Sequence, residues 1–400
     1  MANLSCTPQS TINLTSPEDT LAVLYNTFDT ILVTVIMPFI MIVGHIGNFG
    51  FLFVMFRVKP MRTVTNFYLT HLAVSDICFL SIAVGEKLWR YFLTPVTFDQ
   101  SAMTSTGCIL LYLFMDNTFF ASLMLVTLVS VEKYCSICLP LKHLKLSGKK
   151  RTVTLINVAW FIALAFASCT IPGSSVMVKK CVIWAPMYDD LPPIVGQCQH
   201  ISETWQIAYQ GIQTIPFFGC LVINKVLYAK IILRLHRRAT LNPTLTRQGT
   251  PHTNPILLQR NQMAHMLIIT GMLFSLCLAP FQLLSFMNMI SFAVNDENMI
   301  QDPHVESIVY NICRMLVYLN SAINPIVYNV TNARYRRSFK DAFSCNDEAR
   351  RRRYRSNMST PQISRQNSGK FDTGSRTITA DVGGHLTTIH ESIRSLECPD

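Results

Sequence analysis

TILVTVIMPFIMIVGHIGNFGFLFVMF, from Thr30 to Phe56, contains no Asp, Glu, Lys or Arg. As an α-helix this segment would extend for about 40 Å, which exceeds the roughly 30 Å of hydrocarbon in a bilayer. The opening residues MANLSCTPQS lack the basic region with which a cleavable signal peptide begins, so we expect none. The segment therefore predicts a helix that enters the membrane and stays there.

The rest of the chain has the same apolar character. Of its 400 residues, 50% are hydrophobic and 14% are charged, against about 25% charged in a typical soluble domain. Six further segments are long enough to cross a bilayer as helices, in which the backbone satisfies its own hydrogen bonds. We therefore predict an all-α membrane protein with a seven-helix bundle at 30–329. The predicted spans are 30–56, 64–88, 105–131, 152–174, 204–229, 261–292 and 305–329.

Charges between the spans predict the orientation of the bundle. The connections after the first, third and fifth spans are rich in Lys and Arg, whereas residues 1–29 contain acids and no basic residue. Basic connections stay in the cytoplasm, so we expect an extracellular N-terminus. Sequons at Asn3 and Asn13 are then expected to carry glycans. Because the net charge of +11 comes from inner connections and the tail, it does not indicate binding to nucleic acid.

A short motif marks each span. The third span begins near Cys108 and ends in Glu132-Lys133-Tyr134, and the sixth contains Pro280. Together, over about residues 30–344, the motifs resemble those of rhodopsin-like (class A) G-protein-coupled receptors. The remaining motifs are Gly47-Asn48, Leu72-Ala73-Val74-Ser75-Asp76, Trp160, Pro216, Phe274, Cys277 and Asn324-Pro325-Ile326-Val327-Tyr328.

The resemblance implies a switch for a G protein at the inner end of the third span. Taken alone, Glu132-Lys133-Tyr134 is also typical of an interfacial anchor. Lys133 stands where the family has Arg, which keeps the charge but loses the bidentate fork, so we expect an altered switch. Leu278 stands where most relatives have Trp, and Pro280 still supplies a helix break. The expected switch residues are Glu132, Lys133, Tyr134, Arg260, Asn324, Pro325 and Tyr328.

Charged and aromatic residues near the outer ends of the spans are candidates for ligand binding. Helical spacing can direct them into one cavity, or the charged ones can extend to the interface instead. The string ICRMLVYLNSAINPIVYN resembles peptide receptors of the thyrotropin-releasing-hormone, neuromedin and ghrelin neighbourhood. Amine receptors carry Asp where Met115 stands, which disfavours an amine. The expected ligand-binding residues are Glu86, Met115, Asp116, Phe281, Gln282, Arg314 and Tyr318.

A carboxylate in the middle of a span is costly and requires a partner or a function. By resemblance, Asp76 anchors an allosteric sodium site, and five oxygen-bearing side chains suit a hard cation. The alternative is a neutral Asp76 that packs against Asn48 and Asn324. No other cofactor is expected. The candidate sodium ligands are Asp76, Ser122, Asn320, Ser321 and Asn324.

The outer cysteines and the C-terminal segment add further expectations. The resemblance implies a Cys108–Cys198 disulfide, while a Cys6–Cys181 pair is left open. Residues 332–344 predict an amphipathic interfacial helix, which is followed by a palmitoylation candidate, Cys345. The tail at 345–400 is rich in Ser, Thr and Arg, which predicts disorder, contact with membrane lipids and phosphorylation by receptor kinases for arrestin.

These observations predict a receptor for an extracellular ligand, a neuropeptide by resemblance, that activates a heterotrimeric G protein of the Gq type. One alternative is a receptor-like decoy or scaffold without strong coupling, for which Lys133 and Leu278 are the reason. Another is a receptor for an amine or a lipid. A transporter or channel would show paired internal repeats, which we do not find. The chain has no enzyme motif: no Gly-rich phosphate loop, no triad and no metal cluster.

Overall fold

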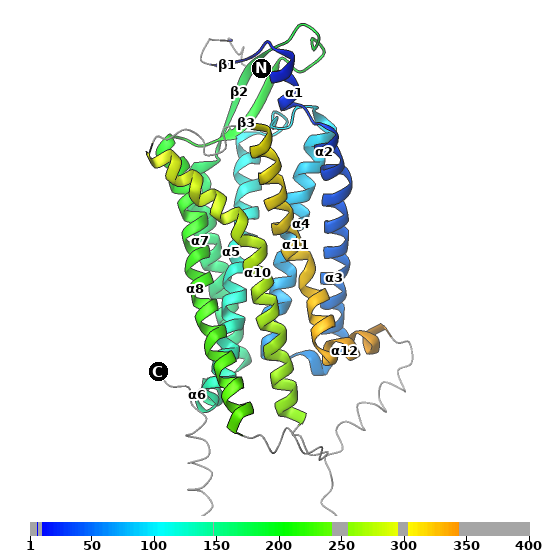
Figure 1. The fold of residues 1–400 in the computed structure, drawn as a ribbon, viewed down its shortest axis with the longest axis vertical. Coiled ribbons are helices and arrows are strands. Elements are labelled where there is room, and N and C mark those ends of the chain that lie inside the picture. The colour runs from blue at the N-terminus through cyan, green and yellow to red at the C-terminus, as the bar shows by residue number, and fades with distance from the viewer. Residues whose placement is uncertain (1–5, 7–9, 147, 242–254, 295–302, 344–400) are drawn as a thin grey trace, which may run out of the picture.

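The computed structural model describes residues 6, 10–146, 148–241, 255–294 and 303–343. Within this part of the chain, seven long helices run side by side, which confirms the predicted all-α seven-helix bundle (Figure 1). The first helix of the bundle runs without a break from α2 through a π-helical turn, η2, into α3. The helices are α2–η2–α3 (Thr27–Ile31, Leu32–Ile36, Met37–Arg57), α4 (Val64–Leu93), α5 (Ser105–Cys138), α7 (Lys149–Cys169), α8 (Glu203–Leu241), α10 (Pro255–Val294) and α11 (Pro303–Thr331).

The outside of the bundle is apolar. Ile46 is 70% exposed and Phe161 73%, as expected of side chains that face lipid rather than water. Six helices in the described part of the chain have the length and composition to cross a membrane. The seventh, α11, is more polar because it turns Asn320, Ser321 and Asn324 into the interior.

The described helices extend beyond several predicted spans. The third span was predicted to end at residue 131, yet α5 continues to Cys138, and α8 continues from the predicted 229 to Leu241. Charged residues mark where a helix leaves the hydrocarbon, but they do not end its hydrogen-bond ladder. The fourth span was predicted to end at 174, whereas α7 ends at Cys169 and a 3₁₀ turn, η4 (Ile171–Gly173), follows it.

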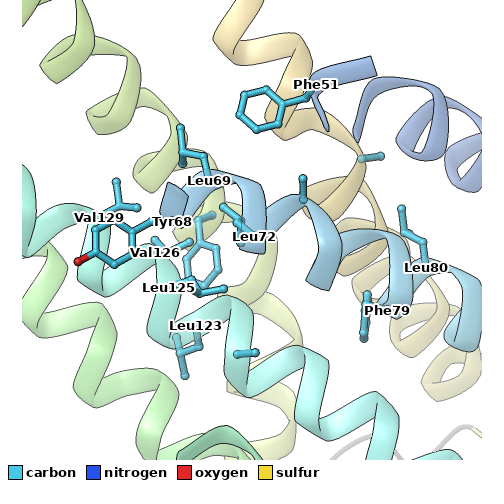
Figure 2. Close-up of a cluster of buried hydrophobic side chains, with 14 of the residues drawn as sticks. Phe51, Tyr68, Leu69, Leu72, Phe79, Leu80, Leu123, Leu125, Val126 and Val129 are labelled. Carbon is cyan, nitrogen blue, oxygen red and sulfur yellow. The ribbon is translucent and has the colours of Figure 1, made fainter. Parts of the chain in front are cut away.

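Close packing between α4 and α5 forms the centre of the bundle. Tyr68 and Leu72 from α4 meet Leu125 and Val129 from α5, all buried (Figure 2). Phe51 joins them from α3. Because lipid tails are as apolar as these side chains, close van der Waals packing holds the helices against one another here, rather than removal of apolar surface from water.

A three-stranded sheet covers one end of the bundle (Figure 1). Strand β1 (Thr11–Leu14) pairs in parallel with β2 (Val176–Trp184), which pairs antiparallel with β3 (Ile194–Gln199). We call this end the sheet end. The sequence analysis did not predict the sheet. The pairing of β1 with β2 joins segments more than 150 residues apart, whereas β2 and β3 are neighbours in the chain.

Two disulfides attach the sheet. Cys108 at the start of α5 bonds to Cys198 in β3, and Cys6 bonds to Cys181 in β2. The Cys6–Cys181 bond holds the N-terminal segment beside the long connection between α7 and α8. The Cys108–Cys198 bond fixes that connection above the bundle.

A short helix, α12 (Ala333–Phe343), lies at the opposite end, which we call the α12 end (Figure 1). Its side chains Tyr335 and Ala342 are buried, whereas Phe343 is exposed. The hydroxyl of Tyr335 donates a hydrogen bond to Asn66 of α4. The helix α6 (Pro140–Leu146) lies at the same end, and α1 (Pro17–Val23) lies at the sheet end.

Gly44 provides a test of the close packing between α3, α4 and α11. A Cβ atom at Gly44 would lie 2.5 Å from Cδ1 of Leu80 and 3.1 Å from Cα of Ala322. Gly44→Ala is therefore expected to lower the free energy of unfolding by about 1–3 kcal/mol, measured by thermal unfolding of the purified protein.

Gly85 is the matched control, because a Cβ there would meet no atom within 4 Å. Gly85→Ala is expected to be neutral or to stabilise by up to about 1 kcal/mol through helix propensity. Equal losses in the two variants would contradict the packing argument.

Candidate functional site

A cavity of about 300 Å³ lies between the helices toward the sheet end, and we call it the deep cavity. This volume is at the lower limit of typical ligand sites. It brings together all seven residues that the sequence analysis assigned to ligand binding. They are Glu86, Met115, Asp116, Phe281, Gln282, Arg314 and Tyr318.

Pro280 and packed aromatic rings position one wall of the deep cavity. We call it the lower wall, and it contains Phe79, Phe281, Gln282 and Tyr318. Phe281 and Gln282 directly follow Pro280 in α10, where the missing proline N–H interrupts the helix ladder. The rings of Phe79 and Tyr318 meet edge to face, with centroids 6.0 Å apart. The lower wall therefore presents mainly aromatic surface with one amide.

Asp116 is held by neutral donors from two other helical elements. The Thr170 hydroxyl donates to Oδ2 at 2.7 Å, and the Gln213 amide donates to Oδ1 at 2.7 Å. Gln213 also donates to the Tyr209 hydroxyl at 2.9 Å. Asp116 is 3% exposed, so these hydrogen bonds compensate its burial. The sequence analysis missed Thr170, Gln213 and Tyr209, because only the packing of α7 and α8 against α5 identifies them.

Charged residues gather where α4 meets α11. Oε1 of Glu86 lies 2.5 Å from Nε of Arg90, and Oε2 lies 3.3 Å from Nζ of Lys87. Arg314 donates to Oδ1 of Asn311 at 3.1 Å. The sequence analysis left open whether Glu86 and Arg314 extend to the interface instead. Both line the deep cavity.

A second cavity of about 460 Å³, the vestibule, lies nearer the sheet. Gln197 of β3 and Asp29 of α2 contribute to its wall. It shares three lining residues, Lys87, Tyr112 and Arg314, with the deep cavity. These residues therefore form the boundary between the two cavities.

The candidate sodium site lies deeper in the bundle. Asn324 donates to Oδ2 of Asp76 at 2.8 Å, while Oδ1 is buried and accepts no hydrogen bond from the described residues. A cavity of about 10 Å³, the size of one water molecule, adjoins the carboxylate. Its lining includes Ser122, Asn320 and Ser321. An unpartnered carboxylate oxygen beside hydroxyl and amide oxygens fits a hard cation.

The Asn48 amide makes its hydrogen bonds to the backbone of two helices. Its amide donates to the carbonyl oxygens of Gly44 and Ser321, each at 3.0 Å. Asn48 therefore joins α3 to α11, and Asn324 alone of the two asparagines is hydrogen-bonded to Asp76.

Among the expected switch residues, Glu132, Tyr134 and Tyr328 lie toward the α12 end, whereas Asn324 lies beside Asp76 in the middle of the bundle. Oε1 of Glu132 is 2.7 Å from Nε2 of His143, a partner in α6 that the sequence analysis did not identify. The ammonium of Lys230 lies 5.9 Å from the centroid of the Tyr134 ring. The Tyr328 ring packs against Phe51, with centroids 5.6 Å apart. The side chain of Arg260 lies outside the described part of the structure.

A hydrogen bond connects α5 and α8 close to this switch. The Ser130 hydroxyl lies 2.7 Å from the Tyr228 hydroxyl. The Tyr228 ring rests against Gly271 of α10, where a Cβ atom would overlap the tyrosine. The contact therefore depends on three helices.

The expected modification sites are placed only in part. Asn13 is exposed on β1 at the sheet end. Asn3 and Cys345 lie outside the described residues, as does the tail at 345–400.

Comparison with known proteins gives the family. Residues 47–328 match the sequence model of the family described as "7 transmembrane receptor (rhodopsin family)". The chain belongs to this family. It is therefore a multi-pass membrane receptor and not an enzyme, and the predicted resemblance is confirmed.

Among the relatives of this rhodopsin-family receptor are receptors for peptides. It is 26% identical to neuromedin-U receptor 2 of Mus musculus over 322 residues, 78% of this chain and 75% of the relative. It is 29% identical to neuromedin-U receptor 1 of Mus musculus over 344 residues, 82% of this chain and 76% of the relative. The thyrotropin-releasing hormone receptor of Mus musculus is 25% identical over 354 residues, 82% of each chain.

The contact between Ser130 and Tyr228 is open to a double-mutant cycle. Ser130→Ala and Tyr228→Phe each remove one hydroxyl of the same hydrogen bond. We expect a coupling free energy of about 0.5–1.5 kcal/mol between the two substitutions, measured by thermal unfolding.

Ser285→Ala with Tyr228→Phe is the control pair, because the Ser285 hydroxyl donates to the Phe281 carbonyl within its own helix. This pair is expected to be additive. Additivity of the Ser130 and Tyr228 substitutions would show that their hydrogen bond contributes nothing to stability.

Proposed function

We propose that this rhodopsin-family receptor binds an extracellular neuropeptide in the deep cavity and vestibule and activates a heterotrimeric G protein. The convergence of all seven expected ligand-binding residues on the deep cavity carries the proposal. Relatives named for neuromedin U and thyrotropin-releasing hormone support a peptide as the ligand class. By resemblance, the G protein is of the Gq type.

The proposed orientation puts the sheet end outside the cell. Two disulfides and the exposed Asn13 sequon lie at this end, and disulfides and glycans belong to an oxidising, extracellular compartment. The basic connections lie at the α12 end, which suits the cytoplasm. The location is the plasma membrane.

The proposed mechanism is a shift between existing conformations. A ligand that contacts Phe281 and Gln282 acts on α10 directly beside Pro280, where the ladder is already interrupted. A ligand that binds one arrangement of α10 more tightly increases its population. Movement of the inner part of α10 then exposes the surface around Lys133 and Tyr328 to the G protein.

The tail and α12 supply the other proposed partners. Arg337 and Lys340 are exposed on α12, and basic side chains beside an anionic leaflet suit contact with lipid headgroups. Phosphorylation of the tail by receptor kinases would add the charge that arrestins bind. Palmitoylation of Cys345 would anchor the end of α12.

A decoy or scaffold is the second candidate function. Leu278 is 2% exposed and fills the place beside Phe274 where most relatives carry an indole ring. Together with Lys133 this favours weak coupling. An amine or a lipid ligand remains the alternative to a peptide in either case.

The first experiment measures calcium and cyclic-nucleotide responses of cells that express the receptor, against a library of short peptides. A dose-dependent response supports the proposal. In Lys133→Arg the guanidinium fork returns, and one added charge-assisted hydrogen bond of about 1.5 kcal/mol corresponds to roughly tenfold stronger coupling.

Lys179→Arg, on the exposed face of β2, is the matched control and should leave the response unchanged. Peptide binding without a response, restored only by Lys133→Arg, would support the decoy. Absence of peptide binding would refute the peptide ligand.

We also propose a sodium ion between Asp76 and the oxygens of Ser122, Asn320, Ser321 and Asn324. Its support is the unpartnered Oδ1 beside the small cavity. An ion that binds the folded receptor raises its Tm with concentration. Replacing choline chloride by NaCl is therefore expected to raise the Tm of the native receptor by about 2 °C or more.

Asp76→Asn removes the charge and should abolish this dependence on sodium. Asp116→Asn is the control, because that carboxylate lies in the deep cavity and is already satisfied by Thr170 and Gln213. A sodium effect that persists in Asp76→Asn would refute the proposed site.

A further inference from the structure

Three basic side chains share one carboxylate at the boundary between the two cavities. Glu86 contacts Arg90 at 2.5 Å and Lys87 at 3.3 Å, and Arg314 interacts electrostatically with the same group. The cluster of Glu86, Lys87, Arg90 and Arg314 therefore sets three basic side chains against one carboxylate. Its members from α4 are largely enclosed, with side-chain exposures of 19% for Lys87 and 8% for Arg90.

Among the described residues, the other two acids that line the cavities are Asp116 and Asp29, and each accepts hydrogen bonds from neutral donors. Both oxygens of Asp116 accept hydrogen bonds from Thr170 and Gln213 in the deep cavity. Asp29 lines the vestibule but not the deep cavity, and its Oδ1 accepts a hydrogen bond from Asn311 at 3.2 Å.

The two cations at the boundary repel each other. Lys87 and Arg314 each line both cavities, and each lies within electrostatic reach of the other. Glu86 is shared among all three basic side chains, so its single charge cannot compensate each of them, and like charges that are withdrawn from water are costly. Stability given up in this way is typical of a binding site.

We propose that Lys87 and Arg314 form a subsite for a carboxylate of the ligand, with the adjoining apolar part of the ligand in the deep cavity. The inference rests on the proposed function and specifies the ligand class: a molecule with a carboxylate next to an aromatic or aliphatic group. Arg314 supplies a planar fork that matches the two carboxylate oxygens, and Lys87 supplies a point charge.

The surroundings of the subsite suit such a ligand. Tyr112, the third residue shared by both cavities, adds a hydroxyl beside the cations. Below it the lining is aromatic, with Phe79, Phe119 and Phe281. A deep cavity of about 300 Å³ holds one large side chain of a peptide rather than several.

The test uses small probes, so that it does not depend on knowing the natural ligand or on signalling. The full-length receptor is purified in detergent, and its Tm is measured with N-acetyl-phenylalanine and with N-acetyl-phenylalaninamide at millimolar concentration. The acid is expected to raise the Tm by about 2 °C or more, and the amide by much less. The amide keeps the ring and removes only the charge.

A second pair of probes separates the two sources of a carboxylate. N-acetyl-aspartyl-phenylalaninamide carries the charge on a side chain, and N-acetyl-asparaginyl-phenylalaninamide is its neutral match. A shift with the terminal acid alone assigns the subsite to a peptide C-terminus. A shift with the aspartyl probe alone assigns it to an acidic side chain, and either result supports a carboxylate.

Variants connect the preference to the two cations. Lys87→Gln and Arg314→Gln are each expected to remove the difference between acid and amide, whereas Lys87→Arg keeps it. Without ligand, Lys87→Gln should unfold at the same or a higher temperature, because it relieves repulsion. Arg90→Gln should unfold at a lower temperature, because it breaks the 2.5 Å pair with Glu86. Lys179→Gln, outside both cavities, is the matched control for loss of one charge.

Equal shifts with the charged and neutral probes, or no shift with any of them, would overturn the subsite. A preference for the acid that survives in both Lys87→Gln and Arg314→Gln would overturn the assignment to these residues. If the subsite is refuted but peptides still evoke a G-protein response, the proposed function is unaffected. If the carboxylate probes raise the Tm but no peptide evokes a response, the subsite is supported and the proposed signalling function is not.

Discussion

Lipid cannot hydrogen-bond, and this constraint governs the rest of the structure. Every backbone group in the hydrocarbon must be satisfied within a helix, so the chain forms seven long helices with apolar outer faces. The same constraint draws polar side chains inward. Asn48 joins α3 to α11, Asn324 meets Asp76 and Gln213 meets Asp116, so these three side chains each tie two helices together.

Those inward polar groups form three connected levels. Near the sheet end, Glu86, Lys87, Arg90 and Arg314 line the cavities that we assign to ligand binding. In the middle, Asp76 adjoins a water-sized cavity. At the α12 end, Glu132 pairs with His143, and Ser130 pairs with Tyr228. Helices α4, α5 and α11 contribute residues to the deep cavity and to the small cavity beside Asp76.

The chain departs from its relatives where the switch is expected to work. Lys133 replaces a guanidinium fork by a single ammonium, and Leu278 replaces an aromatic ring by a smaller side chain that is nevertheless buried. Pro280 and the contact of Glu132 with His143 remain as elements that control α10 and the inner end of α5. The sheet and its two disulfides link α5, the N-terminal segment and the connection between α7 and α8 at the sheet end.

The amino-acid sequence by itself determined the seven helices, because hydropathy and the bilayer thickness leave a spanning segment few choices. Motifs such as Asn324-Pro325 also gave the family, which the comparison confirmed. Only the tertiary structure decided that Thr170 and Gln213 hold Asp116, that His143 reaches Glu132, and that β1 joins the sheet. These contacts join residues from different elements, and periodicity within one helix carries no information about which side chain of another helix it will meet.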